Sequence, residues 1–274
     1  MVTMDFEPVF SGSVEFTRET LTGKWVRWVI LFLLGLPMAL LPIIGPYFFD
    51  VKTIFSGTKI HWELIPWNYI AVALVVVVFL SFFVSGYMVR IYRGGRTPPD
   101  FDQVGRLFID GIKVDIVIFV WFLPMIILIL LALLLIVTAM SAGPGAMLGL
   151  IGLFLLFILL FIIAAIVGGL FSTLGAIRFA RTGKITEGWN YKEILATIRR
   201  IGWGSYIVAL VIIIVISLIF GLVVGIISLI PYAGRVIEAA ANPFLMIFIA
   251  RFITMVYEAG EPGPAIAESP AGTA

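Results

Sequence analysis

The chain has no cysteine among its 274 residues. Disulfides, haem-thiolate centres, iron–sulfur clusters and cysteine nucleophiles are therefore excluded. Histidine is nearly as scarce, because His61 stands alone, and a single histidine rarely builds a metal site or a catalytic triad. The sequence also lacks a Gly-x-Ser-x-Gly elbow and a phosphate-binding glycine loop. We therefore expect no enzyme, no cofactor, no catalytic residue and no metal site.

Charged residues are also scarce. Asp, Glu, Lys and Arg make up 12% of the chain and hydrophobic residues 62%, whereas a soluble domain is about a quarter charged and about half apolar. Six apolar runs approach or exceed the roughly 20 residues that cross a hydrocarbon core. The sequence thus predicts an all-α integral membrane protein with six transmembrane helices. We place them at Trp25–Ile44, Trp67–Ile91, Ile116–Ser141, Ala146–Ala176, Tyr206–Ile230 and Ala239–Val256.

Basic residues are distributed unevenly between the two sides of these spans. Of the 18 Lys and Arg residues, only Lys52, Lys59 and Arg235 fall on one side. The positive-inside rule then predicts a multi-pass protein of the cell membrane with both termini in the cytosol. Because the other basic residues flank hydrophobic spans, we expect membrane lipids as partners, and a membrane-protein partner in second place, but no nucleic acid.

Three passages of the chain follow one plan, a surface helix and then two apolar runs. In the second passage Asp100 is a candidate helix cap with Gln103 reaching back to it, and in the third Asn190 and Glu193 repeat this capping box. Apolar residues at helical spacing follow each cap. We therefore predict three pseudo-repeated hairpins, each preceded by a cytosolic amphipathic interfacial helix.

The predicted domain organisation follows from these repeats. A single transmembrane domain covers residues 1–260, with repeat units at about 1–96, 97–184 and 185–260. Residues 261–274 lack an apolar period and are rich in Gly, Pro and Ala, which is typical of a disordered tail. Within the last span, we expect Pro243 in the first helical turn, where its missing N–H costs nothing.

Three arginines occupy corresponding places near the cytosolic end of each hairpin: Arg90, Arg178 and Arg251. The simpler interpretation is that they snorkel to the interface and complement the negative ends of the helix dipoles. The sharper hypothesis is that they converge on a pocket that binds a lipid headgroup or another anion. The sequence does not decide whether the three arginines meet.

Four acidic residues gather in the second surface helix: Asp100, Asp102, Asp110 and Asp115. Paired carboxylates could hold a divalent metal ion, as in lipid phosphotransferases, but the spacing here does not match that enzyme class. We expect Asp110 to pair with Arg106 or Lys113 instead. The acidic cluster therefore does not change the expectation of a non-enzymatic protein.

Several stretches resemble an uncharacterised family of polytopic membrane proteins, best represented in methanogenic archaea and known as a domain of unknown function. They are YRGGRTPPDFD from Tyr92, GRLFIDGIK, RFARTGK with KEILATIRRIGW, and the closing IARF and YEAG. The resemblance runs from about the second span to Gly260, and its most specific part is Pro-Pro-Asp-Phe. It implies a multi-span cell-membrane protein and brings no substrate, cofactor or catalytic residue.

Two functions follow as expectations. The leading one is a non-enzymatic membrane scaffold or lipid-interacting module. The alternative is a transporter or channel for a hydrophobic or lipid-like substrate. A water-lined cavity beside Arg90, Arg178 and Arg251 would favour transport, and a tightly packed bundle would favour the scaffold.

Overall fold

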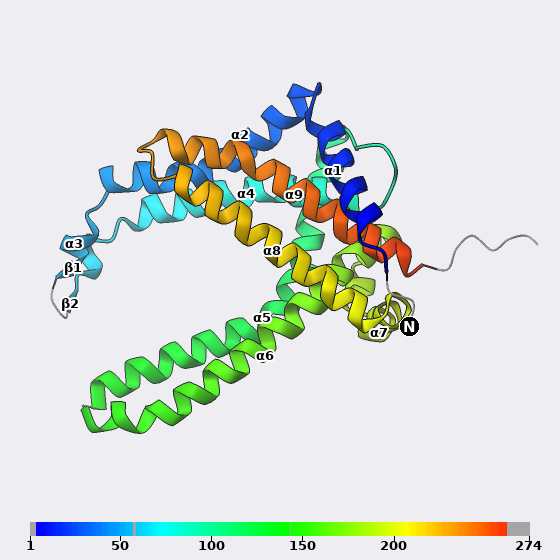
Figure 1. Cartoon of the computed structure of the whole chain (residues 1–274). Coiled ribbons are helices and arrows are strands. Elements are labelled where there is room, and N and C mark those ends of the chain that lie inside the picture. Colours follow the sequence, from blue (N-terminus) through cyan, green and yellow to red (C-terminus); the bar gives the residue numbers. More distant parts are fainter. Residues whose placement is uncertain (1–3, 57–58, 143, 262–274) are drawn as a thin grey trace, which may run out of the picture.

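The computed structural model describes residues 4–56, 59–142 and 144–261 (Figure 1). All of the predicted tail except Glu261 therefore lies outside the described residues. The long helices are α2 (Trp25–Ile44), α4 (Trp67–Tyr92), α5 (Val104–Ala142), α6 (Pro144–Thr182), α8 (Trp203–Ile227) and α9 (Ala233–Ala259). Shorter helices are α1 (Glu7–Leu21), α3 (Val51–Ile54) and α7 (Tyr191–Ile201), with single turns η1 (Gly45–Tyr47), η2 (Trp62–Leu64) and η3 (Ile185–Trp189). Strands β1 (Phe55–Ser56) and β2 (Lys59–Ile60) form a small antiparallel pair between α2 and α4.

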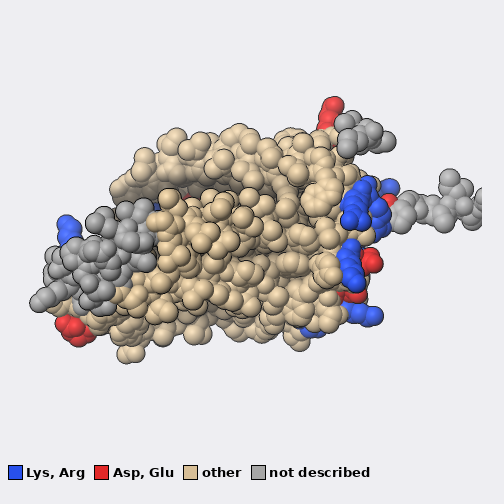
Figure 2. All heavy atoms as spheres, turned by 90° about the horizontal axis from the view of Figure 1, so that it is seen from below, with Lys and Arg blue, Asp and Glu red and all other residues tan. Residues whose placement is uncertain are grey.

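Six helices are long and apolar enough to cross a membrane, so the predicted all-α architecture with six spans is confirmed within the described residues. Helix α2 has the bounds predicted for the first span, Trp25–Ile44, and the candidate span of the structure extends through η1 to Tyr47. Figure 2 shows charged side chains gathered at the two ends of the long helices, with a broad surface of other residues between them. This distribution is what a hydrocarbon layer around the middle of the helices requires.

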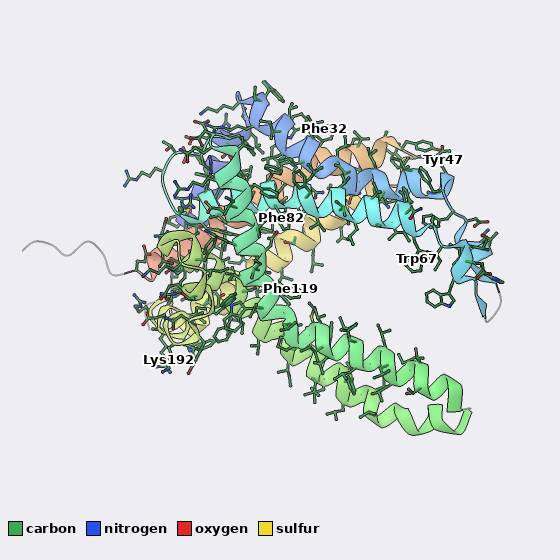
Figure 3. All side chains as sticks on the ribbon, turned by 180° about the vertical axis from the view of Figure 1, so that it is seen from behind. Phe32, Tyr47, Trp67, Phe82, Phe119 and Lys192 are labelled. Carbon is green, nitrogen blue, oxygen red and sulfur yellow. The ribbon has the colours of Figure 1, made fainter. Side chains whose placement is uncertain are left out.

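The surface helices differ from the prediction in the second passage. Helices α1 and α7 are separate from the spans that follow, because Gly23 and Gly202 adopt positive φ angles of 78° and 90° that end the helix. No such break lies between Lys113 and Ile116, and α5 runs without interruption from Val104 into the membrane span. In Figure 3 this helix changes direction near Phe119. Pro124, whose ring crowds the carbonyl of Val120, explains the bend.

Helices α4 and α5 cross with their backbones in contact. A Cβ atom on Gly86 would lie 1.9 Å from the carbonyl oxygen of Leu107, and one on Gly111 would lie 1.8 Å from that of Phe82. Each helix therefore presents a glycine to the other at the crossing. Lipid gives helices little hydrophobic reason to associate, so such close backbone packing is a main source of their attraction. Phe108 adds ring contacts with Phe79 and Phe83 at 5.1 and 5.0 Å between centroids.

The apolar core lies at the end of the molecule where α1, α7 and the end of α9 meet (Figure 1). Helix α9 supplies most of it, including Phe252, Ile253 and Val256, which are all fully buried. The inner face of α7 adds Ile194 and Ile198. Both described ends of the chain reach this same end, so the protein has one charged, well-packed end, which we call the charged end.

Helix α9 begins earlier than the sequence predicted. It starts at Ala233, so Pro243 lies in the interior of the helix and is buried, not in the first turn. Residues 233–241 add helical turns before Asn242, and the neighbouring α2 packs against α9 there. Trp28 donates its indole N–H to the carbonyl of Ala240 at 3.0 Å. This bond satisfies a carbonyl in the turn that Pro243 disturbs.

Helices α5 and α6 form a hairpin that diverges from the other spanning helices with distance from the charged end (Figures 1 and 3). Over their outer halves the two helices pack mainly on each other. Their outward side chains, such as Leu130 at 60% and Leu134 at 59%, are largely exposed. In a bilayer this hairpin, here called the α5–α6 arm, is surrounded by lipid.

The close contact of Gly86 and Gly111 at the α4–α5 crossing predicts that alanine at either position lowers the stability of the protein. Gly86→Ala or Gly111→Ala would force α4 and α5 apart, and overpacking of this kind typically costs about 1–3 kcal/mol. We expect a lower midpoint of thermal unfolding for each variant in detergent, measured by tryptophan fluorescence. Gly105→Ala on the same helix is the matched control, since nothing lies within 4 Å of its added Cβ. Equal midpoints for all three variants would contradict the crossing.

Candidate functional site

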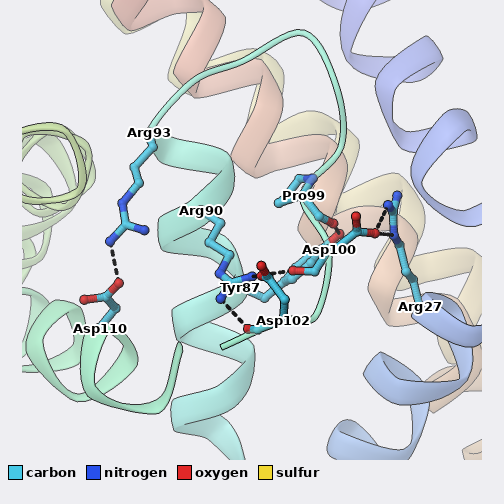
Figure 4. Close-up of polar contacts among 8 residues, drawn as sticks. All are labelled: Arg27, Tyr87, Arg90, Arg93, Pro99, Asp100, Asp102 and Asp110. Carbon is cyan, nitrogen blue, oxygen red and sulfur yellow. Dashed lines mark hydrogen bonds and ion pairs between the residues drawn. The ribbon is translucent and has the colours of Figure 1, made fainter. Parts of the chain in front are cut away.

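Arginine side chains crowd the charged end, and nearby carboxylates neutralise most of them. Figure 4 shows the part of this arrangement around the segment between α4 and α5. Arg27 of α2 reaches Asp100, and its Nε donates to Oδ1 at 3.1 Å. Arg90 of α4 pairs with Asp102 and also donates to the backbone carbonyls of Asp100 and Asp102. The two arginines thus hold residues 100–102 from opposite sides.

The same segment is held by its aromatic residue. Phe101 stacks on Tyr87 with ring centroids 4.4 Å apart and planes 4° apart. The hydroxyl of Tyr87 donates to the carbonyl of Pro99 at 3.2 Å. The Pro-Pro-Asp-Phe segment, residues 98–101, is therefore held against α4 at the charged end. Asp100 is not the cap of α5, which begins only at Val104, and Gln103 adopts a positive φ of 44° before it.

A second group of bonds ties α4 to α6. Arg93 pairs with Asp110 and donates through Nε to the carbonyl of Ala180 at 3.3 Å. Arg181 returns the contact by donating through Nε to the carbonyl of Tyr92 at 3.3 Å. Asp110 thus pairs with Arg93, and the expectation of Arg106 or Lys113 was wrong. Arg93 directly follows α4, and its bond to Ala180 of α6 places its guanidinium beside Asp110 of α5. The partner of Asp110 therefore comes from another part of the chain than its own helix.

Arg178 of α6 forms a third group of bonds, with carboxylates of η3 and α7. Its Nη2 lies 2.6 Å from Oε2 of Glu187, and its Nη1 lies 3.7 Å from Glu193. The Asn190 side chain accepts the backbone N–H of Glu193 at 3.4 Å at the start of α7. The cap and the arginine together fix the junction between α6 and α7.

The last group surrounds Glu258 near the end of α9. Glu258 lies 2.9 Å from Nη2 of Arg181 and 3.7 Å from Nη1 of Arg251. The guanidinium of Arg251 also lies over the ring of Phe16, 5.1 Å from its centroid, which adds a cation–π contact with α1. A side chain on Gly94 would collide with this group, since a Cβ would lie 2.8 Å from Oε1 of Glu258.

The three predicted arginines therefore have different partners. Arg90 binds Asp102, Arg178 binds Glu187, and Arg251 shares Glu258 with Arg181. Among the described residues, no hydrogen bond or ion pair joins Arg90, Arg178 and Arg251 to one common group. The sequence analysis missed Arg27, Arg93 and Arg181, although each is a basic residue at the end of an apolar run. Three donor nitrogens stay buried without a hydrogen bond within the described chain: Nη1 of Arg27, Nε of Arg178 and Nη1 of Arg251.

Ion pairing shifts the pKa of two carboxylates at the charged end, the exposed Asp100 and the partly buried Glu187. The hydrogen bond and charge of Arg27 lower the pKa of Asp100 below its ordinary value. The hydrogen bond from Arg178, helped by Asn190, lowers the pKa of Glu187 in the same way. These carboxylates are therefore charged at neutral pH. Across the described ranges, no three His, Asp or Glu side chains are grouped closely enough to hold a metal ion.

A long apolar groove lies on the α5–α6 arm. It has a volume of about 770 Å³ and is lined along α5 by Val120 to Leu128, and along α6 by Leu160 to Val167. Pro124 and Ala164 leave room between the helices, while Trp121 and Trp189 stand at its end nearest the charged groups. Both indoles are fixed: Trp121 donates to the carbonyl of Gly188 at 2.9 Å and Trp189 to that of Val117 at 3.3 Å. Charged side chains take no part in the lining.

Comparison with known proteins places the chain in a family. A family described as "Protein of unknown function (DUF4013)" matches residues 69–229, which is more than half of the chain. The chain therefore belongs to this family, and the match runs from α4 to just after α8. It includes Arg90, Arg178 and the groove, and it ends before Arg251. No curated protein and no solved structure matches the chain.

The ion pairs predict a pH dependence of stability. The pKa values of Asp100 and Glu187 are lowered in the folded state. Their contribution to the free energy of unfolding is therefore fully present when the pH is above the ordinary carboxylate pKa, and it is lost as the pH falls through the lowered pKa values. We expect the unfolding midpoint in detergent to drop below about pH 4. An Asp100→Asn, Glu187→Gln double variant should be less stable at pH 7 and show a smaller drop. A Glu15→Gln, Glu19→Gln control should keep the full drop, since these exposed residues of α1 make no ion pair among the described residues.

Proposed function

We propose that this member of a family of unknown function is a non-enzymatic, lipid-interacting module of the cell membrane that holds a lipid acyl chain in the groove of the α5–α6 arm. The observation that carries the proposal is the groove itself. It is apolar throughout, it runs along the helices for about 12 Å, and two hydrogen-bonded tryptophans stand at one end. Tryptophans at this position suit the interfacial layer of a bilayer.

Charge supports the assignment of the acyl chain rather than the headgroup to the groove. The nearest charged residue along η3 is Glu187, which is already paired with Arg178. Lys184 and Lys192 flank η3 and provide positive charge for an anionic headgroup at the surface. Binding of an anion by Arg90, Arg178 and Arg251 stays a separate hypothesis, and it would require these arginines to exchange a carboxylate partner for the ligand.

A transporter or channel for a hydrophobic or lipid-like substrate is the second candidate. The divergence of the α5–α6 arm from the other helices favours it, because lipid would have access from the side (Figure 1). The apolar lining of the groove and the pairing of the arginines argue for lipid contact over a water-filled path. For this reason we place the lipid-interacting module first.

We also infer that residues 1–96, 97–184 and 185–260 are pseudo-repeats with interfacial helices on the cytosolic side. Supporting this inference, α1 and α7 each precede a pair of long apolar helices, and the first turns of α5 occupy the corresponding place in the middle unit. The uneven distribution of Lys and Arg supports cytosolic termini. A family distribution centred on methanogenic archaea stays a prediction.

Native mass spectrometry tests the lipid proposal. We expect wild-type protein, gently extracted from its own membrane, to retain a lipid that is reduced roughly fivefold or more in Ala164→Trp, whose indole would fill the groove. Gly221→Trp on α8 is the control, because open space surrounds its Cβ outside the groove. The anion hypothesis predicts instead that Arg90→Gln, Arg178→Gln and Arg251→Gln lose the lipid. Wild-type protein without a retained lipid, or equal retention by Ala164→Trp, would overturn the groove proposal.

Cysteine labelling tests the proposed orientation, since the natural chain provides a cysteine-free background. A membrane-impermeant maleimide should label Glu63→Cys in intact cells, because η2 lies at the end opposite the termini. Arg199→Cys, on the exposed face of α7, should react only after the membrane is permeabilised. The reverse pattern would place both termini outside the cytosol.

A further inference from the structure

A second cavity lies between α2, α4 and α9, away from both the arginines and the α5–α6 groove. It has a volume of about 310 Å³, near the lower end of small-molecule sites. Gly35 and Met38 line it from α2, Ser81 from α4, and Asn242 and Pro243 from α9. Gly35 lies ten residues into α2 and Asn242 nine residues into α9, which is about 15 and 13 Å from the helix starts. The cavity is therefore well inside the membrane layer.

Three polar side chains line the cavity, and they differ in their partners: Ser85 bonds to Asp115 and Ser81 to its own helix, whereas Asn242 has none among the described residues. The side chain of Asn242 is exposed to the cavity, and within the described part of the chain its amide makes no hydrogen bond. Ser81 donates to the carbonyl of Val78 at 2.8 Å and keeps its lone pairs free. An amide in hydrocarbon without a hydrogen bond costs on the order of several kcal/mol. A polar ligand in the cavity would remove that cost.

Prolines add backbone acceptors to the same cavity. Pro243 has no N–H to return to the carbonyl of Ala239, and Pro42 has none for the carbonyl of Met38. Both Ala239 and Met38 line the cavity. The adjacent carbonyl of Ala240, which Pro243 does not free, accepts the indole N–H of Trp28, so carbonyls in this part of α9 are within reach of donors outside the helix.

The chemistry of the lining selects the ligand. No charged side chain lines the cavity, so an ionised group would enter without compensation. The available partners are the Asn242 amide, the oxygens of Ser81 and Ser85, and the carbonyls freed by proline, which together donate to and accept from a hydroxyl group. We propose that the cavity between α2, α4 and α9 binds an uncharged lipid through a free hydroxyl group placed against Asn242. The hydrocarbon chain of that lipid would contact apolar residues such as Leu31 and Met246.

This site is independent of the α5–α6 groove, and its variants can be tested separately. The probe is hexadecanol carrying a photoreactive diazirine and a terminal alkyne, added to the protein in vesicles of uncharged phospholipid. Asn242→Leu removes the amide at similar size, and we expect roughly fivefold weaker labelling, the effect of about one hydrogen bond. Gly35→Phe fills the cavity and should also reduce labelling, while open space around its Cβ leaves the helix undisturbed.

Ser217→Leu on α8 is the control for a polar-to-leucine change outside the cavity and should label like wild type. A chain-matched alkane probe without the hydroxyl group should label wild type and Asn242→Leu equally and weakly. Asn242→Leu should also unfold at the same or a higher temperature than wild type, since an unpaired amide is lost, and this separates loss of binding from loss of folding. Equal alcohol labelling of wild type, Asn242→Leu and Gly35→Phe would overturn the proposal.

Discussion

Helix association without a hydrophobic driving force is the constraint on which this structure depends. Apart from the buried α9, the long helices leave most of their sides exposed to the hydrocarbon layer, so burying them against each other removes little apolar surface from water. The protein instead concentrates direct attraction at the charged end and at one backbone crossing. Arginine–carboxylate pairs, indole-to-carbonyl bonds and the reciprocal glycines of α4 and α5 supply it. Farther from that end the contacts thin out, and the α5–α6 arm diverges.

Much of the fold was predictable from the sequence, because apolar length and charge spacing act within a single helix. Six helices long and apolar enough to span a membrane were recognised, and helix α2 has its predicted bounds. The start of α9 was misplaced because Pro243 was assigned to the first turn, whereas contact with α2 keeps the helix intact around it. The prediction of a separate surface helix that begins at Asp100 was also wrong, because α5 begins at Val104 and continues into the span. Gly23 and Gly202, with positive φ, end α1 and α7 before a span, whereas no residue of α5 between Val104 and its span has a positive φ.

The candidate site was less predictable than the fold. Arg90, Arg178 and Arg251 were identified by their corresponding positions, but Arg90 and Arg178 find their partners in irregular segments, and Arg251 shares Glu258 of its own helix with Arg181. The pair between Arg181 and Glu258 joins residues 77 positions apart, and no pattern along the chain indicates it. Asn242 and the freed carbonyls near it form a cavity only because α2, α4 and α9 meet there. Tertiary contacts of this kind leave no periodic signal in a single sequence.

Helix α9 has a consequence for how the chain is made. It packs against α1, α2, α4 and α8, and it contributes the largest part of the buried core. It also follows these four helices in the chain, so it leaves the ribosome after them. The α2–α4 pair must therefore wait in the bilayer with its inner face covered by lipid, while α5 and α6 can pair with each other as soon as both are inserted. When α9 is inserted it replaces that lipid, and its arrival completes the packing of α2 and α4.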